Sequence, residues 1–136
     1  MLEALSTPHN RTMTFVFLAA CAASATAAFA VTVSDNPPGI LLAFLAAAAF
    51  ILAFAHPWRT ARPFRLLFYG SVLGVVIFAV LHNVFDAIPA AGGLHTLLQA
   101  VSVAAFFLAV FLFPPAFLIG AAGWVAMGIR NRRRPA

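Results

Sequence analysis

The side chains best suited to chemistry in this sequence include a histidine and a carboxylate one helical turn apart. His82 and Asp86 are four residues apart, so a helix places them on one face. Ser71 falls on the same face, because the eleven residues that separate it from His82 make nearly three whole turns. We therefore expect these three side chains to form one polar stripe.

A second polar stripe follows shortly after the first. His95, Gln99 and Ser102 have the spacing i, i+4, i+7, which describes one face of a helix. A short connection joins the two segments, so we expect the stripes to face each other at one end of two neighbouring helices. The resulting candidate site contains two imidazoles, one carboxylate, one amide and two hydroxyls.

The chemistry of such a cluster has several interpretations. An unpaired polar group costs several kcal/mol in hydrocarbon, so the expected role is a hydrogen-bonded tie between two helices, with no cofactor. Alternatively, two imidazoles and a carboxylate bind a metal or haem, or hydrogen-bond a quinone. Solvation at the membrane interface is a third interpretation.

The elements that position this cluster are predicted to be membrane helices. Of the 136 residues, 64% are hydrophobic and 8% are charged, whereas a soluble domain is nearer half apolar and a quarter charged. Three apolar runs each suit one span of about 20 residues, and a span in lipid must satisfy its own backbone groups. The sequence predicts a single-domain, all-α integral membrane protein over 1–136, with four helices as two hairpins at about 14–33, 39–55, 66–85 and 97–129.

The fourth run is too long for a simple span. Its 33 residues make roughly 50 Å of helix, against a hydrocarbon core of about 30 Å. Pro114 and Pro115 interrupt it, which predicts a kink at this point. We expect one long kinked helix, with a shorter helix plus an interfacial segment at 116–129 as the alternative.

The arginines predict the orientation in the membrane. All eight fall on one side of a four-span topology, and the opposite connections carry Asp35 and Asp86. The positive-inside rule makes the arginine side cytoplasmic, with both termini inside. Abundant alanine and absent lysine favour a bacterial inner membrane. The basic groups predicted to meet lipid headgroups, rather than nucleic acid, are Arg59, Arg62, Arg65, Arg130, Arg132, Arg133 and Arg134.

Small residues predict close contacts between helices, because apolar side chains gain little by leaving lipid for one another. Gly70 and Gly74 form a GxxxG motif, and Ala116 and Gly120 form a second pair of small residues. The helix that they meet lies either in this chain or in another protein.

The function predicted from these patterns is non-catalytic. No HExxH, GxSxG, P-loop or CxxC motif is present, and no Asp, Glu or Lys falls at mid-bilayer. We expect an accessory or assembly subunit of a larger membrane complex, in contact with lipid and with other subunits or a second copy. The alternatives are a small oligomeric transporter or channel, and a redox protein that uses the histidine cluster to bind haem, metal or quinone.

Overall fold

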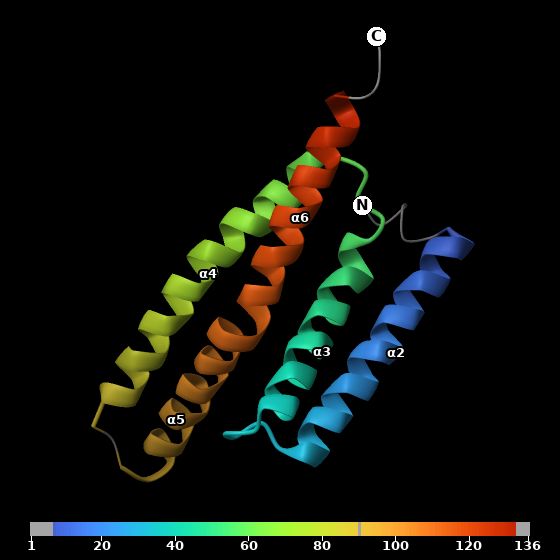
Figure 1. Ribbon diagram of the computed structural model, residues 1–136. Helices are drawn as coiled ribbons and strands as arrows, with labels where there is room; N and C mark the ends of the chain where they lie inside the picture. The colour runs from blue at the N-terminus through green and yellow to red at the C-terminus, as the bar shows by residue number, and fades with distance from the viewer. Residues whose placement is uncertain (1–6, 90, 133–136) are drawn as a thin grey trace.

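The structure is all helical over the residues that it describes. The computed structural model describes residues 7–89 and 91–132, and four of its helices are long and apolar enough to cross a membrane. In chain order these are α2 (Pro8–Val31), α3 (Pro37–Ala55), α4 (Ala61–Ala87) and a continuous segment, Gly92–Arg132 (Figure 1). This confirms the prediction of an all-α protein with four apolar helices.

The helices begin earlier than the apolar runs predicted. α2 begins at Pro8 rather than near residue 14, and α4 begins at Ala61 rather than near residue 66. The first turns contain polar and basic residues, and a helix needs no apolar side chain there. Pro8 and Pro37 stand in first turns, where a missing N–H costs no hydrogen bond. The apolar run therefore marks the part of a helix suited to hydrocarbon, and the helix itself is longer.

A tight turn joins α2 to α3. Thr32 and Asp35 have positive φ angles of 68° and 52°, and the Asn36 side chain donates a 2.7 Å hydrogen bond to the carbonyl of Val31. A Cβ on Gly39 would lie 1.8 Å from the Thr32 carbonyl oxygen. Only glycine allows α3 to pass this close to the end of α2.

The last helical segment is irregular one turn before its two prolines. It consists of α5 (Gly92–Phe107), the π-helical turn η1 (Leu108–Leu112) and α6 (Phe113–Arg132). At the end of η1 the Phe113 N–H bonds to the Leu108 carbonyl, five residues back. Pro114 and Pro115 offer no N–H, and in an α-helix their rings would meet carbonyls four residues earlier. The wider turn relieves that clash.

This turn lies close to the expected irregularity. The sequence predicts a kink at Pro114–Pro115, and the structure adds a departure from α-helical bonding at Leu108–Leu112, one turn earlier. Helix α6 follows η1 without a break, so residues 116–129 are part of one long helix and not a separate interfacial segment.

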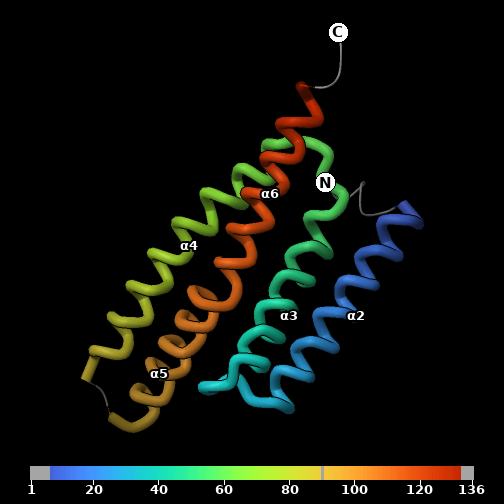
Figure 2. Tube along the Cα trace, viewed as in Figure 1, coloured from blue at the N-terminus to red at the C-terminus, as the bar shows by residue number. Residues whose placement is uncertain are grey.

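The helices pack in a consistent order. α2 packs chiefly against α3, and α4 packs against both α5 and α6, as Figure 2 shows along the Cα trace. α3 makes its smaller contacts with η1 and α6. The buried side chains are mostly small: Ala28, Ala46, Ala53, Ala55, Ser71, Ser102, Ala105, Ala109 and Ala116, with Phe64 as the one buried large side chain among the described residues. Small residues let helix backbones approach closely, which is the main source of association in lipid.

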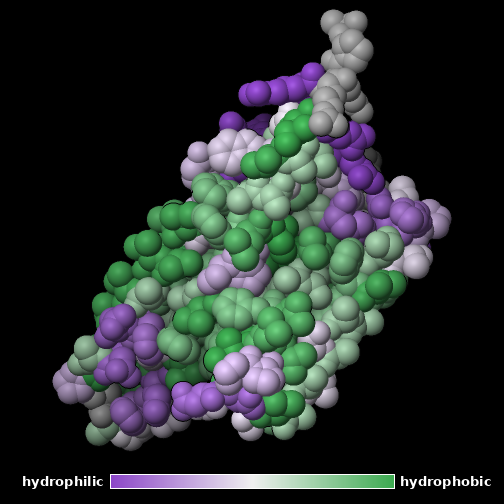
Figure 3. Space-filling view, in the orientation of Figure 1, coloured by the Kyte–Doolittle hydropathy of each residue, from purple (hydrophilic) through white to green (hydrophobic). Residues whose placement is uncertain are grey.

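The two ends of the molecule differ in charge. We call one the arginine end: it holds the start of α2, the α3–α4 connection and the end of α6, with Arg11, Arg59, Arg62, Arg65, Arg130 and Arg132 (Figure 1). The opposite end, the aspartate end, holds Asp35 and Asp86. On the face in Figure 3, hydrophilic side chains gather at both ends and a hydrophobic band lies between them. Arg133 and Arg134 lie outside the described residues.

Candidate functional site

The closest polar contacts between helices join α4 to α5. The Nδ1 atom of His82 lies 2.8 Å from the Ser102 hydroxyl and 3.1 Å from the Ser102 carbonyl oxygen. The same hydroxyl is 3.2 Å from the His82 carbonyl oxygen. Ser102 is 1% exposed, so α5 is held against α4 by a desolvated side chain.

These contacts define the protonation of the ring. The Ser102 carbonyl only accepts, so it requires a proton on Nδ1 of His82. The Ser102 hydroxyl then donates to the His82 carbonyl, and each group finds a partner. The neutral ring that satisfies all of these contacts carries its proton on Nδ1 and leaves the Nε2 lone pair free.

The remaining members of the predicted cluster lie around a separate cleft. Asp86, His95 and Gln99 line a hollow of about 60 Å³ at the aspartate end, and all three are exposed. His82 does not line this cleft. The structure therefore divides the predicted cluster in two, a desolvated His82–Ser102 pair and an exposed group at the helix ends.

A metal would need three ligands gathered at one point, and these residues are not so arranged. Within residues 7–89 and 91–132, no three His, Cys, Asp or Glu side chains are grouped closely enough to hold a metal ion. His82 lies apart from the cleft that Asp86 and His95 line.

Ser71 lies apart from both groups. Although it shares a helix face with His82, eleven residues of α-helix separate the two by about 16 Å along the axis. Its hydroxyl donates a 2.8 Å bond to the Phe68 carbonyl of its own helix, and the residue is 2% exposed. Ser71 and His82 lie on the same helix face but do not meet, because they lie at different depths along the helix axis.

The small residues of α4 and α6 meet along their contact. A Cβ on Gly74 would lie 2.3 Å from the Phe113 ring, and one on Gly120 would lie 2.7 Å from the backbone nitrogen of Phe68. Ala116 is also buried. Gly70 differs: a Cβ there would meet no atom within 4 Å. Of the two glycines of the GxxxG motif, Gly74 therefore lies at the α4–α6 contact, whereas Gly70 faces open space.

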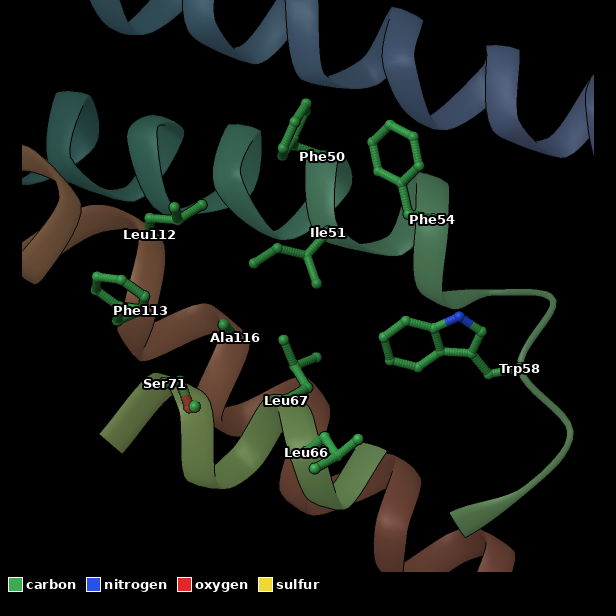
Figure 4. A pocket seen from close by; sticks show the side chains of 11 residues that line it. Phe50, Ile51, Phe54, Trp58, Leu66, Leu67, Ser71, Leu112, Phe113 and Ala116 are labelled. Carbon is green, nitrogen blue, oxygen red and sulfur yellow. The ribbon is translucent and has the colours of Figure 1, made fainter. Parts of the chain in front are cut away.

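The open side of Gly70 belongs to a groove at the arginine end. A cavity of about 360 Å³ lies between α3 on one side and α4 with α6 on the other (Figure 4). We call it the Trp58 slot, after the side chain nearest the α3–α4 connection. Its lining includes Ile51, Phe54, Trp58, Leu66, Gly70 and Ala116. The slot was not predicted from the sequence, where the GxxxG motif assigned Gly70 to helix packing. The available signal was the missing side chain of Gly70 on a helix face that otherwise carries large side chains.

Two buried nitrogens near the arginine end have no hydrogen-bond partner. His56 Nδ1 lies 3.1 Å from the carbonyl oxygens of Leu52 and Ala53, which places its proton on Nδ1 and leaves Nε2 unpaired. The Nε1–H of Trp58 is the second.

The arginines surround this end without pairing to the described acids. Arg59, Arg62, Arg65, Arg130 and Arg132 are all exposed, and Asp35 and Asp86 lie at the far end of the helices. The end is therefore strongly electropositive, as an anionic lipid surface requires. Comparison of the chain with known protein families, with curated proteins and with solved structures gave no match.

Proposed function

We propose that this chain is a non-catalytic subunit of a larger membrane assembly, docked to its partner through the outer face of α2. The membrane is a bacterial inner membrane, with the arginine end and both termini on the cytoplasmic side.

The observation that carries the proposal is the outer face of α2. This helix packs chiefly against α3, and 6% of its most apolar 18 residues are buried. The face turned away from α3 carries Ala19, Ala23, Thr26 and Ala30, spaced i, i+4, i+7, i+11, and all four are exposed. A helix face this smooth lets a second backbone approach closely, which is how helices associate in lipid.

The contrast with other surfaces supports the choice of α2. The exposed side chains of α4 include Leu66 at 62% and Leu73 at 60%, and that of Leu118 on α6 is 64% exposed. Helix α2 also exposes Phe15 and Phe29, which stand beside the small face toward its two ends. Long apolar side chains interdigitate with lipid tails and keep other helices at a distance. The two kinds of surface favour lipid around α4 and α6 and a protein partner beside α2.

The transporter alternative needs a polar path through the bilayer. The Trp58 slot and a second cavity of about 420 Å³ beside Ser71 and Pro114 are lined almost entirely by apolar side chains. His82, Asp86, His95, Gln99 and Ser102 all lie in the part of α4 and α5 toward the aspartate end. These features favour a structural role over transport.

The test is the size of the complex that the full chain forms in its own membrane. After gentle detergent extraction and native electrophoresis, we expect a tagged chain to migrate with a different polypeptide, as one heteromeric band. Ala23→Phe places a bulky ring on the α2 face and should release the chain from that band.

The matched control is Leu73→Phe, which enlarges an exposed side chain on α4 and should leave the band intact. A chain that migrates alone, a band that contains only copies of this chain, or an Ala23→Phe variant that stays in the complex would each contradict the proposal.

A further inference from the structure

The Trp58 slot is a groove that opens sideways between two helices. Its rim contains Phe50, Phe54 and Leu66, which are 45%, 39% and 62% exposed. Its floor contains Ser71 and Ala116, which are buried. Figure 4 shows Ile51, Leu67 and Trp58 directed into the space between α3 and the α4–α6 pair. A molecule in the bilayer therefore reaches the floor of the slot without passing through water.

The slot suits a thin apolar chain. Its volume of about 360 Å³ is at the lower end for small-molecule pockets. An α-helix with its side chains is 10–12 Å across and does not fit inside such a space. The hydroxyl of Ser71 on the floor is already bonded to the Phe68 carbonyl, so the floor offers no free polar group at this position.

The mouth of the slot at the arginine end is polar and positive. Trp58 lines it with an unpartnered indole N–H, and Arg59 is the next residue. Arg62 precedes the rim residue Leu66 by one helical turn, so it extends the same face of α4 toward the membrane surface. Both arginines are exposed. The described acidic residues, Asp35 and Asp86, lie at the opposite end of the helices.

We propose that the slot binds one acyl chain of an anionic phospholipid, whose headgroup phosphate lies beside Arg59 and Arg62. The apolar floor holds the chain, and Arg59 and Arg62 select the headgroup. This site does not depend on the docking role of α2.

Trp58 itself reports on the occupant. In a Trp124→Phe chain it is the sole tryptophan, and bromine on a lipid tail quenches its fluorescence on contact. The chain is placed in phosphatidylcholine vesicles that contain increasing fractions of brominated phosphatidylglycerol or, separately, brominated phosphatidylcholine. We expect half-maximal quenching at an about 25-fold lower fraction of the anionic lipid, since each of the two arginines near such a headgroup contributes about fivefold.

Two pairs of variants separate the slot from general lipid contact. Gly70→Leu places a side chain in the slot, where a Cβ meets no atom within 4 Å, and should remove the preference. Gly128→Leu, where a Cβ also meets no atom within 4 Å, should keep it. Arg59→Gln with Arg62→Gln should also remove it, and Arg130→Gln with Arg132→Gln should not.

Native mass spectrometry of the unaltered chain gives a second measurement. Retention of phosphatidylglycerol over phosphatidylcholine is expected. Equal quenching or retention of the two lipids would overturn the proposal, as would an unchanged preference in Gly70→Leu. A Gly70→Leu chain that changes its oligomeric state would instead show that protein occupies the slot, and would also overturn it.

Discussion

At the scale of single residues, Ser102 does the most to join α4 to α5. It takes part in three hydrogen-bond contacts with His82, two through its hydroxyl and one through its carbonyl. Its small side chain also allows the close approach of the two helices. The described residues contain a natural comparison in Ser71, which is equally buried but bonds within its own helix.

Replacing Ser102 by alanine should weaken the fold more than replacing Ser71. Ser102→Ala removes the hydroxyl contacts to His82 and should lower the free energy of unfolding by about 0.6–1.7 kcal/mol, the range for side-chain hydrogen bonds between membrane helices. Ser71→Ala removes a bond within one helix and should change it by less. Unfolding in mixed micelles, followed by circular dichroism, measures both; equal losses would contradict an interhelical role for Ser102.

The sequence predicted which residues were polar and on which helix face they stood, but not how they pair. The spacing of His82 with Asp86 and of His95 with Ser102 identified two stripes. Which members meet depends on the rotation and depth of α5 relative to α4, and several packings satisfy the same spacing. In the structure His82 meets Ser102, the innermost member of its stripe, while Asp86 and His95 remain near the surface.

At the scale of elements, glycine and phenylalanine interlock along the α4–α6 contact. The Phe113 ring lies over Gly74, and the Phe64 ring lies over Gly123, so each helix supplies a ring to a glycine of the other. The contact at Gly120 is the hardest to relieve, because its near neighbour is backbone and cannot rotate away. A clash between a new Cβ and a ring is easier to relieve than a clash between a new Cβ and backbone, because the ring can move.

Gly120→Ala should therefore force α4 and α6 apart. Its Cβ would lie 2.7 Å from the Phe68 nitrogen, and such overpacking typically costs about 1–3 kcal/mol. Gly128→Ala, on the same helix with no atom within 4 Å, should instead gain up to about 1 kcal/mol from the better helix propensity of alanine. The same unfolding measurement compares them, and a neutral Gly120→Ala would show that the contact is looser than described.

Helix number was predictable at this scale, and helix detail was not. Three apolar runs of the right length and a fourth with two prolines were enough to predict four helices. The starts of α2 and α4 were not predicted, because a first helical turn made of polar residues shows no hydrophobic pattern. The π turn was not predicted from the sequence. Two prolines constrain the backbone before them, but the position at which the helix takes in an extra residue depends on packing, here of Phe113 on Gly74.

At the scale of the whole molecule, charge is separated along the helix axes. The six described arginines stand at one end and the two described aspartates at the other, with a hydrophobic band between them. The separation arises because each helix reverses the direction of the chain and the arginines occur only in alternate connections. Each connection contributes its own arginines to the orientation signal, so moving one arginine should not reverse the orientation of the chain in the membrane.

Cysteine labelling in intact cells tests the orientation. Cys21 is the one cysteine, so a Cys21→Ser chain accepts single cysteines elsewhere. Ser34 in the α2–α3 turn and Thr60 before α4 are both exposed, and the Thr60 side chain makes no capping bond, so either replacement should preserve the fold. With the arginine end in the cytoplasm, an impermeant maleimide should label Ser34→Cys in spheroplasts and Thr60→Cys only after lysis. The reverse pattern would place the arginines outside; labelling of both sites before lysis would mean that the chain inserts in two orientations, and that the arginines do not determine its topology.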